Sequence, residues 1–424
     1  MEGLIRSVLT SLLFAGLLID HAIASSFDIP VSKETDVGVQ AQLAEGDTLL
    51  LWLPSESGFL KQEKRLAEQL VLGGMETWFA DMLGGYFLPA LASSVDAVIA
   101  EDTAELIEQV RLKSRKKIIL IASGRGAAMA IRGANVWQQK YGSGARLAGV
   151  ILISPKLFVE TPEPGSEGEL LPVVGRTNLP LFIIQPENSP WRWKMDRVIP
   201  ALEKSGSDVY AWFLKNARDR FYYRPDATPG EDRMASRLAF FISSATTLLQ
   251  GFSEKKRIID KTLSVTAIKI AEGKKARILR EYKGNPAPPE LVLADMEGRQ
   301  VDLAALKGQV VLVNYWASWC PPCVHEMPSM QRLSEHFKSK PFRILAVNMA
   351  EDKSTIQDFL QNKVNVKFPI LLDVDGKALK RWKVFAFPTS YIIGKKGNIR
   401  LALFGSIDWM QDDVIEKIKR LIEE

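Results

Sequence analysis

The sequence predicts an α/β protein built from two domains, and three observations support this. At roughly 150 residues per domain, the 424 residues of the chain are enough for two or three domains. Short apolar runs alternate with segments of helical spacing in both halves of the chain, as in sheets covered by helices. The proline-rich stretch 285–289 cannot continue a helix and separates the halves. We expect a mostly parallel sheet over 25–250, a basic linker over 251–285 and a smaller α/β domain over 286–424.

In the first domain, apolar runs predict strands, and apolar residues three and four positions apart predict helices. The predicted strands are 48–53, 76–79, 117–122, 148–153, 181–185 and 209–214. The predicted helices are 63–72, 98–110, 127–138, 197–204 and 233–249. The proline- and acid-rich stretch 160–172 lacks a core pattern and is predicted to be a surface excursion.

The second domain is predicted to open with a short hairpin over 291–303 and to alternate strands with helices after it. The predicted strands are 310–316, 343–348, 369–372, 390–393 and 399–404. The predicted helices are 321–337, 354–362 and 411–422.

Residues 1–24 have the features of a secretory signal peptide. Arg6 supplies a positive charge, Val8–Leu18 is apolar, and Ala22-Ile23-Ala24 has the small-residue spacing of a cleavage site. The apolar run is too short to span about 30 Å of hydrocarbon; an uncleaved signal anchor is the alternative. We therefore expect a protein exported to the periplasm, and soluble once the signal is cleaved.

The net charge of +5 is concentrated in the predicted linker. Residues 251–285 hold 10 basic and 4 acidic side chains, whereas the two domains are nearly balanced. A strip of this kind can contact an anionic membrane surface or an acidic partner. The other interpretation is a solvated linker, because charge runs usually face water. Neither domain has the basic patch that a nucleic-acid partner would need.

The chain has two cysteines, and both lie in the motif Trp319-Cys320-Pro321-Pro322-Cys323, which follows an apolar strand and opens a predicted helix. A helix N-terminus offers free N–H groups and the positive end of the dipole, which can lower the pKa of a thiol from about 8.5 to roughly 3.5–7.5. The prolines are tolerated in a first turn and stiffen it. We expect Cys320 to be the exposed attacking thiolate and Cys323 the buried resolving thiol.

Two other uses of the cysteine pair fit the sequence less well. A structural disulfide would close a loop too short for much entropic stabilisation. A zinc site would need further cysteine or histidine ligands, and His325 is expected to point elsewhere on its helix. The sequence thus predicts redox exchange through the Cys320–Cys323 disulfide, with no metal and no other cofactor.

Residues 286–424 resemble the TlpA/ResA branch of exported thioredoxin-like proteins. The resemblance rests on Val313–Cys323, with Trp319, Pro321 and Pro322 in it, on Glu326-Met327-Pro328, and on Phe387-Pro388-Thr389. It implies a thioredoxin-like fold and thiol–disulfide exchange, mostly as a reductase in cytochrome c maturation or on other periplasmic thiols. It also implies that Pro388 is cis and lies against the disulfide, where the backbone of Phe387 would face an extended client segment.

The same resemblance raises the question of which group takes the proton of Cys323. Typical thioredoxins have a buried acid for this role, and Asn314 stands at its position here, as it often does in the TlpA/ResA branch. Glu326, one turn beyond Cys323, is a candidate replacement. The alternative is that Glu326 is a structural cap or pairing partner.

The segment 117–129 resembles the nucleophile elbow of the α/β-hydrolases, and the order of elements extends this resemblance over most of the first domain. An elbow needs Gly-x-Ser-x-Gly. If Gly126 is the second glycine, Gly124 stands at the nucleophile; if Ser123 is the nucleophile, neither glycine position holds glycine. The resemblance would place the acidic residue of the catalytic triad at Glu187.

The same comparison places Arg218-Asp219-Arg220 where the hydrolase histidine would stand. No histidine lies between residues 22 and 324, so the general base is missing. We therefore predict an α/β-hydrolase-like domain without a catalytic triad. Aromatic residues on its loops could line a ligand or partner surface, with ordinary packing as the alternative. They are Trp191, Trp193, Phe221, Tyr222 and Tyr223.

The sequence thus predicts a periplasmic thiol–disulfide oxidoreductase. Its expected partners are protein thiol or disulfide clients and a membrane-bound electron donor. Two alternatives remain at this point: an adaptor whose hydrolase-like domain recruits a client, and a hydrolase regulated by its redox domain.

Overall fold

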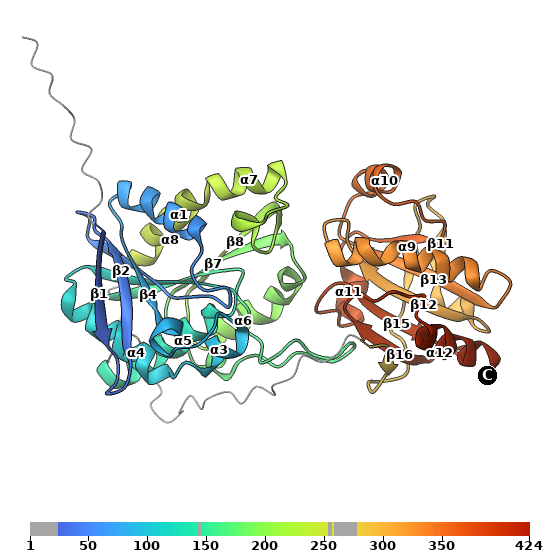
Figure 1. Ribbon diagram of the computed structural model, residues 1–424, viewed down its shortest axis with the longest axis horizontal. Coiled ribbons are helices and arrows are strands. Elements are labelled where there is room, and N and C mark those ends of the chain that lie inside the picture. The colour runs from blue at the N-terminus through green and yellow to red at the C-terminus, as the bar shows by residue number, and fades with distance from the viewer. Residues whose placement is uncertain (1–23, 143–145, 253–256, 258–277) are drawn as a thin grey trace, which may run out of the picture.

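The computed structural model describes residues 24–142, 146–252, 257 and 278–424 (Figure 1). We call 24–257 the N-terminal domain and 278–424 the C-terminal domain. The predicted signal peptide, up to residue 23, and most of the predicted linker lie outside the described residues. Within the described ranges, no helix is long and apolar enough to cross a membrane.

The N-terminal domain is built on an eight-stranded sheet in the order β1-β2-β4-β3-β5-β6-β7-β8. β2 pairs antiparallel with β1 and β4, and every pair from β4–β3 to β7–β8 is parallel. The strands are β1 Ala24–Pro30, β2 Asp36–Gln42, β3 Thr48–Trp52, β4 Glu76–Asp81, β5 Lys117–Ser123, β6 Leu147–Ile153, β7 Leu181–Asn188 and β8 Val209–Arg218. The predicted parallel sheet is confirmed, and the β1–β2 hairpin is an addition to it.

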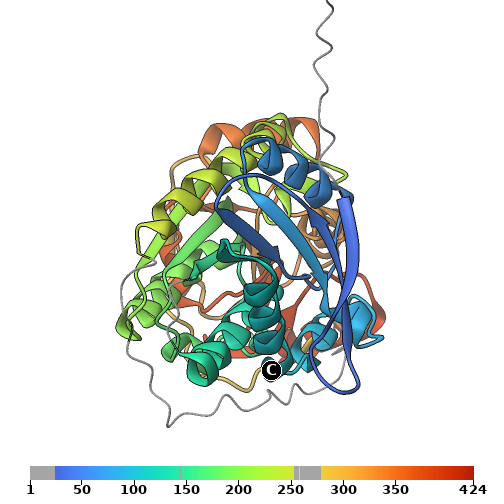
Figure 2. The same ribbon diagram turned by 90° about the vertical axis from the view of Figure 1, so that its left-hand side faces the viewer.

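Helices cover both faces of this sheet (Figures 1 and 2). They are α1 Lys61–Leu72, α2 Met82–Gly85, α3 Ala92–Ala97, α4 Ala100–Lys113, α5 Gly126–Tyr141, α6 Met195–Lys204, α7 Pro229–Ser236 and α8 Leu238–Gln250. Short 3₁₀ turns add Pro172–Gly175, Pro190–Lys194 and Phe221–Tyr223. The single helix predicted over 233–249 is wrong: it is split between α7 and α8 at Arg237, whose N–H bonds Met234 O at 3.2 Å and so tightens the last turn of α7.

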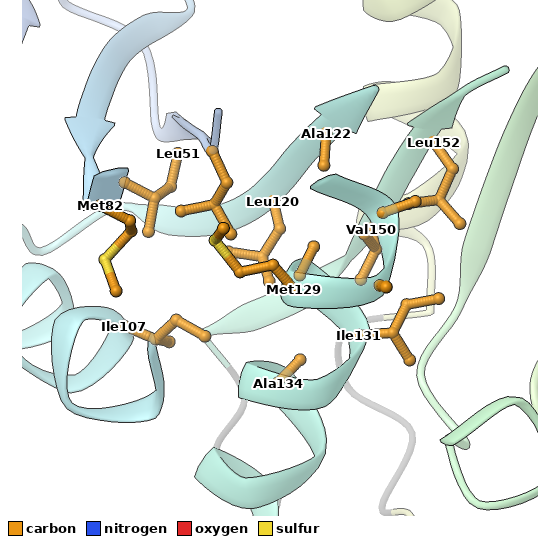
Figure 3. Close-up of a cluster of buried hydrophobic side chains, with 14 of the residues drawn as sticks. Leu51, Met82, Ile107, Leu120, Ala122, Met129, Ile131, Ala134, Val150 and Leu152 are labelled. Carbon is orange, nitrogen blue, oxygen red and sulfur yellow. The ribbon is translucent and has the colours of Figure 1, made fainter. Parts of the chain in front are cut away.

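Alternate residues of the parallel strands supply two separate apolar layers, because successive side chains point to opposite faces. Leu51, Leu120 and Val150 pack with α4 and α5 on one face (Figure 3). Side chains of α6 belong to the same cluster. Their neighbours Leu50, Ile119 and Ile151 pack with α1 and α8 on the other. Continuous burial of this kind explains the unbroken apolar runs in the sequence.

The C-terminal domain has a six-stranded sheet in the order β14-β13-β12-β15-β16-β9. β12, β13 and β14 are parallel to one another, while β15, β16 and β9 pair antiparallel. The strands are β9 Arg280–Glu281, β12 Val310–Trp316, β13 Phe342–Met349, β14 Ile370–Asp373, β15 Thr389–Ile393 and β16 Ile399–Phe404. β10 Val292–Ala294 and β11 Gln300–Asp302 form the predicted hairpin.

The helices of this domain lie on both faces of its sheet. They are α9 Pro321–His336, α10 Lys353–Asn362, α11 Lys377–Arg381 and α12 Asp412–Glu423, with a 3₁₀ turn at Leu303–Leu306. α9 and α12 bury apolar side chains against one face, and α11 against the other. β9 lies in the segment predicted as linker, and Leu279 beside it is 1% exposed in the core of this domain. The α/β class of both domains is confirmed, and α11 and β9 are additions.

We predict that Gly133→Ala destabilises the N-terminal domain. A Cβ at Gly133 of α5 would lie 2.6 Å from Cβ of Thr103 in α4 and closer still to its Cγ2, so the two helices must separate. Overpacking of this kind costs about 1–3 kcal/mol, against at most about 1 kcal/mol gained in helix propensity. Urea titration followed by circular dichroism should show a lower midpoint.

The matched control is Gly175→Ala, because a Cβ there meets no atom within 4 Å. If both variants unfold at the same urea concentration, the close contact between α4 and α5 is not a constraint on stability.

Candidate functional site

The two cysteines form a disulfide at the start of α9, directly after the central strand β12. Their sulfurs are 2.10 Å apart and their Cα atoms 5.3 Å apart. Cys320 is the N-cap residue of α9, and the Cys323 N–H donates to Cys320 Sγ at 3.3 Å. A donor already aimed at this sulfur would stabilise negative charge on it, as predicted from the helix N-terminus.

The two sulfurs differ in accessibility. Cys320 is 6% exposed and Cys323 is completely buried. Cys320 is therefore the more accessible sulfur, although the structure exposes it less than the sequence predicts, because it packs in the apolar cluster of α9 and β12. Pro321 and Pro322 fill the first turn of α9 and are exposed.

The loop before β15 lies beside the disulfide motif. The Phe387–Pro388 peptide bond is cis, as the resemblance implies. The ring of Phe387 packs edge-on against that of Trp319, with centroids 5.8 Å apart. Both rings are partly buried against the cluster that contains the cysteines. The structure thus brings Trp319 and Phe387 together at one site with the disulfide.

Glu326 lies one turn after Cys323 on the inner face of α9 and is 2% exposed. Its Oε1 accepts from Asn314 Nδ2 at 2.8 Å, and its Oε2 accepts from Trp409 Nε1 at 3.2 Å. Burial raises the pKa of Glu326 to about 8, although both hydrogen bonds lower it. No cation pairs with this carboxyl group in the described part of the chain, so at neutral pH it is mostly protonated.

Glu351 is a buried acid that the sequence did not single out. It follows β13, is 9% exposed, and accepts hydrogen bonds from both the N–H and the hydroxyl of Ser318. Asn348 Nδ2 also donates to it at 2.7 Å. Glu351 therefore fixes the turn that leads into Trp319. Only its place after an apolar strand distinguishes it in the sequence, and many acids share that feature.

The N-terminal domain reaches the disulfide motif through Arg218. Its guanidinium donates to the Trp319 carbonyl oxygen at 3.3 Å. It is held by ion pairs to Glu231 at 2.6 Å and Asp226 at 3.1 Å. The hydrogen bond to Glu231 raises the pKa of Arg218, so this cation is fixed in its charged form.

The N-terminal domain also packs against the loop that leads to Pro388. Phe385 is 4% exposed and belongs to the core cluster of the N-terminal domain. Its ring centroid lies 5.5 Å from that of Phe158 and 6.4 Å from that of Trp191. Lys194 Nζ lies 3.9 Å from the centroid of the same ring. Both loops of the redox site are therefore in contact with the N-terminal domain.

The predicted surface excursion 160–172 takes part in this interface. It leaves the N-terminal domain between β6 and β7 and extends toward the C-terminal domain (Figure 1). Glu167 pairs with Lys383 of the C-terminal domain at 3.3 Å and with Arg197 at 3.0 Å. Gly168 lies so close to Phe385 that a Cβ there would be 2.7 Å from the ring. The excursion is therefore a contact between domains.

The five aromatic residues considered from the sequence separate into three environments. Phe221 is buried in the core. Trp193 donates to Met349 Sδ of the C-terminal domain at 3.0 Å. The remaining three line a cavity at the carboxyl ends of the parallel strands. They are Trp191, Tyr222 and Tyr223.

The turn after β5 carries no side chain at its sharpest point. Ser123 is the last residue of β5, and Gly124 has a φ of +54°. A Cβ at Gly124 would lie 2.9 Å from Glu56 Oε1 and closer still to Oε2. Of the two alignments considered from the sequence, this geometry favours the one with Gly124 at the nucleophile position, since an elbow nucleophile occupies a strained turn.

The other residues expected at triad positions do not form one. Glu187 lies within β7 and is not among the residues that line the cavity. Asp219 does line it, and accepts a hydrogen bond from the Ser189 hydroxyl at 2.8 Å. Among the described residues, no group of three or more His, Cys, Asp or Glu side chains is arranged to hold a metal ion.

Known proteins match the C-terminal third of the chain. Residues 284–402 match the model of the AhpC/TSA family. The thiol-disulfide oxidoreductase ResA of Bacillus subtilis is 35% identical over 135 residues, which are 32% of this chain and 73% of that protein. ResA of Bacillus thuringiensis is also 35% identical, over 26% of this chain and 64% of its own length.

Solved structures align with about a third of the chain. A putative thiol:disulfide interchange protein DsbE from Chlorobium tepidum is 28% identical and covers 33% of this chain and 94% of its own, with a TM-score of 0.29. StoA from Bacillus subtilis is 27% identical and covers 32% and 98%, with a TM-score of 0.28. Through its C-terminal domain, the chain belongs to the thioredoxin-fold thiol-disulfide oxidoreductases of the ResA type.

Proposed function

We propose that this protein is an exported oxidoreductase that reduces disulfides of client proteins through Cys320 and Cys323. The observation that carries the proposal is the disulfide at the N-terminus of α9, with Cys320 as the more accessible sulfur. The cis Phe387–Pro388 bond beside it supports a site for an extended client segment.

The reaction begins with the reduced pair. The Cys320 thiolate attacks one sulfur of the client disulfide, a mixed disulfide forms, and the other client sulfur leaves as a thiolate that takes up a proton. Cys323 then loses its proton and attacks Cys320 Sγ. The Cys320–Cys323 disulfide forms, and the client leaves with two thiols. A donor dithiol restores the reduced pair by the reverse exchange.

We assign to Glu326 the role of exchanging a proton with Cys323, in which the ionised form of the carboxyl group takes up the proton that the thiol releases. Its pKa of about 8 leaves a minor fraction of Glu326 ionised near neutral pH, and this fraction grows as the pH rises toward 8. Glu326 acts through Cys323 in this proposal and is therefore a positioning residue. Trp319 and Phe387, whose rings pack together, flank the path of the client.

The proposal also covers the cellular location of the protein, its clients and its electron donor. The signal-peptide features of residues 1–24 support export to the periplasm, where clients include proteins of cytochrome c maturation or other envelope thiols. A membrane-bound dithiol is the proposed electron donor. The basic linker, 251–285, supports peripheral contact with an anionic membrane.

For the N-terminal domain, over 25–250, we propose an α/β-hydrolase-like architecture without hydrolase activity. The strand order, the side-chain-free turn at Gly124 and the lack of histidine support it. Its contacts with Trp319 and Phe385 favour a second role, that of an adaptor which presents clients to Cys320.

Trapping tests the reaction. In Cys323→Ser the mixed disulfide through Cys320 cannot be resolved, so we expect client proteins to accumulate on the variant. Non-reducing electrophoresis of the exported protein, followed by mass spectrometry, measures the adducts. Cys320→Ser is the matched control and should trap none. Equal amounts of adduct on both variants would contradict the assigned order of attack.

Glu326 makes the stability of the oxidised protein depend on pH. The folded carboxyl keeps its proton up to about pH 8, whereas the unfolded one releases it near its usual value of 4.5. The folded state therefore binds more protons between these values, and the free energy of unfolding falls as the pH rises through that window. Glu326→Gln imitates the protonated acid and should flatten this fall.

Urea titrations of both oxidised proteins at a series of pH values measure this difference. Groups other than Glu326 contribute equally to both curves and cancel in the comparison. Parallel curves for the two proteins would show that Glu326 is ionised in the folded state.

A further inference from the structure

The cavity in the N-terminal domain has the location and size of a ligand site. Its volume is about 300 Å³, which is the lower end of the range for small-molecule pockets. It is formed by the loops that follow β3, β5, β6 and β8, together with Trp191. In open α/β sheets, ligands bind at the carboxyl ends of the strands.

Three buried polar atoms that line this cavity have no hydrogen-bond partner in the described structure. They are Ser154 Oγ, Asp219 Oδ1 and Arg224 Nε. Buried polar atoms are rarely left unpaired, because each costs free energy of desolvation. Ser154 also has a φ of +48°, uncommon outside glycine, which the surrounding structure must hold in place. An occupant with acceptor oxygens could pair with Ser154 Oγ and Arg224 Nε, whereas Asp219 Oδ1 needs a donor.

The charges that line the cavity favour an anionic occupant. Lys156 forms an ion pair with Glu56, with 2.6 Å between Nζ and Oε1. Burial alone would raise the pKa of Glu56, but this ion pair and the Arg125 N–H keep it below its usual value, so the pair is fixed. The lining also holds Asp219, Arg220 and Arg224, so three cations face two acids there; Arg220 lies near the same Glu56, and Arg224 pairs with Asp226 outside the lining.

Arg220 is the more available of the two arginines. Its side chain is 50% exposed, and its guanidinium lies 3.9 Å from Glu56. Arg224 donates from its other nitrogens to the Asp219 carbonyl at 3.3 Å and to Asp226 at 3.0 Å, which leaves Nε for the cavity. Two guanidinium groups with unused N–H donors match the oxygens of a carboxylate.

The remaining walls of the cavity are aromatic. Trp191, Tyr222 and Tyr223 line it, and aromatic walls favour a flat apolar body. At the turn after β5, the Glu56 carboxylate takes the space that a nucleophile's side chain would need at Gly124. The turn at Gly124 therefore has no room for a nucleophilic side chain.

We propose that this cavity binds a small organic carboxylate with a flat apolar body. Arg220 and Arg224 hold the carboxylate, Ser154 donates its hydroxyl to it, and the aromatic side chains enclose the body. The site is separate from the disulfide and goes beyond the proposed reductase function.

Calorimetric titration of the full exported protein tests this proposal. The probes are phenylacetate and indole-3-acetate, with phenylacetamide and indole-3-acetamide as uncharged counterparts. We expect saturable binding of at least one carboxylate at one site per chain, and binding of its amide at least about tenfold weaker, since a charge-assisted hydrogen bond is lost.

Arg220→Gln should weaken carboxylate binding about tenfold, and Ser154→Ala should weaken it in the same direction. Arg220 is half exposed, so its replacement should leave the fold intact, which circular dichroism checks. Arg65→Gln removes the same charge from the exposed face of α1, outside the cavity lining, and should leave binding unchanged.

Three results would overturn the proposal: no saturable binding of either carboxylate, equal binding of acid and amide, or binding unaffected by Arg220→Gln. A failure here is distinguishable from a failure of the redox function, because trapping on Cys323→Ser does not depend on Arg220.

Discussion

The position of one helix N-terminus governs the arrangement of the redox site. α9 starts directly after the central strand β12, so its first turn is held by the best-buried part of the C-terminal sheet. This fixes Cys320 where the N–H of Cys323 already points at its sulfur. The same helix turns Cys323 and Glu326 inward, since residues three apart share a face. A single element, α9, therefore sets the positions of Cys320, Cys323 and Glu326.

The second constraint is the contact between domains. The N-terminal domain touches the site at two loops, through the bond of Arg218 to Trp319 and the packing of Phe385 in its core. A rearrangement at either loop would have to disturb the ion pairs of Arg218 or expose a buried phenylalanine. Both changes are costly, because buried charges need their partners and buried rings need their neighbours. The two domains are thus held together at both loops that flank the disulfide.

Elements that carry strong periodic signals can be predicted from the sequence, whereas those that depend on tertiary contacts cannot. The parallel strands and α9 are unbroken apolar or motif-bearing segments, and their bounds differ from the predictions by a few residues. The β1–β2 hairpin is half-buried at the edge of the sheet, so its pattern is weak. Glu351 and Arg218 act on the site through loops distant in sequence, which no local pattern reveals. The turn at Gly124 could not be assigned from the sequence, because neither alignment with an elbow fits the motif and only the backbone φ distinguishes them.

Two buried acids, one in each domain, have pKa values shifted in opposite directions. Burial raises the pKa of both Glu326 and Glu56, since it penalises the ionised form in each. Glu326 has only neutral donors around it, so burial prevails and it keeps a proton near pH 7. Glu56 lies 2.6 Å from Lys156, and the ion pair reverses the shift. A carboxyl group that stays ionised across the physiological range cannot serve as a proton store, but it can fix a cation in the wall of a cavity. The pKa values of Glu326 and Glu56 therefore differ because of their hydrogen-bond and ion-pair partners rather than because of their burial.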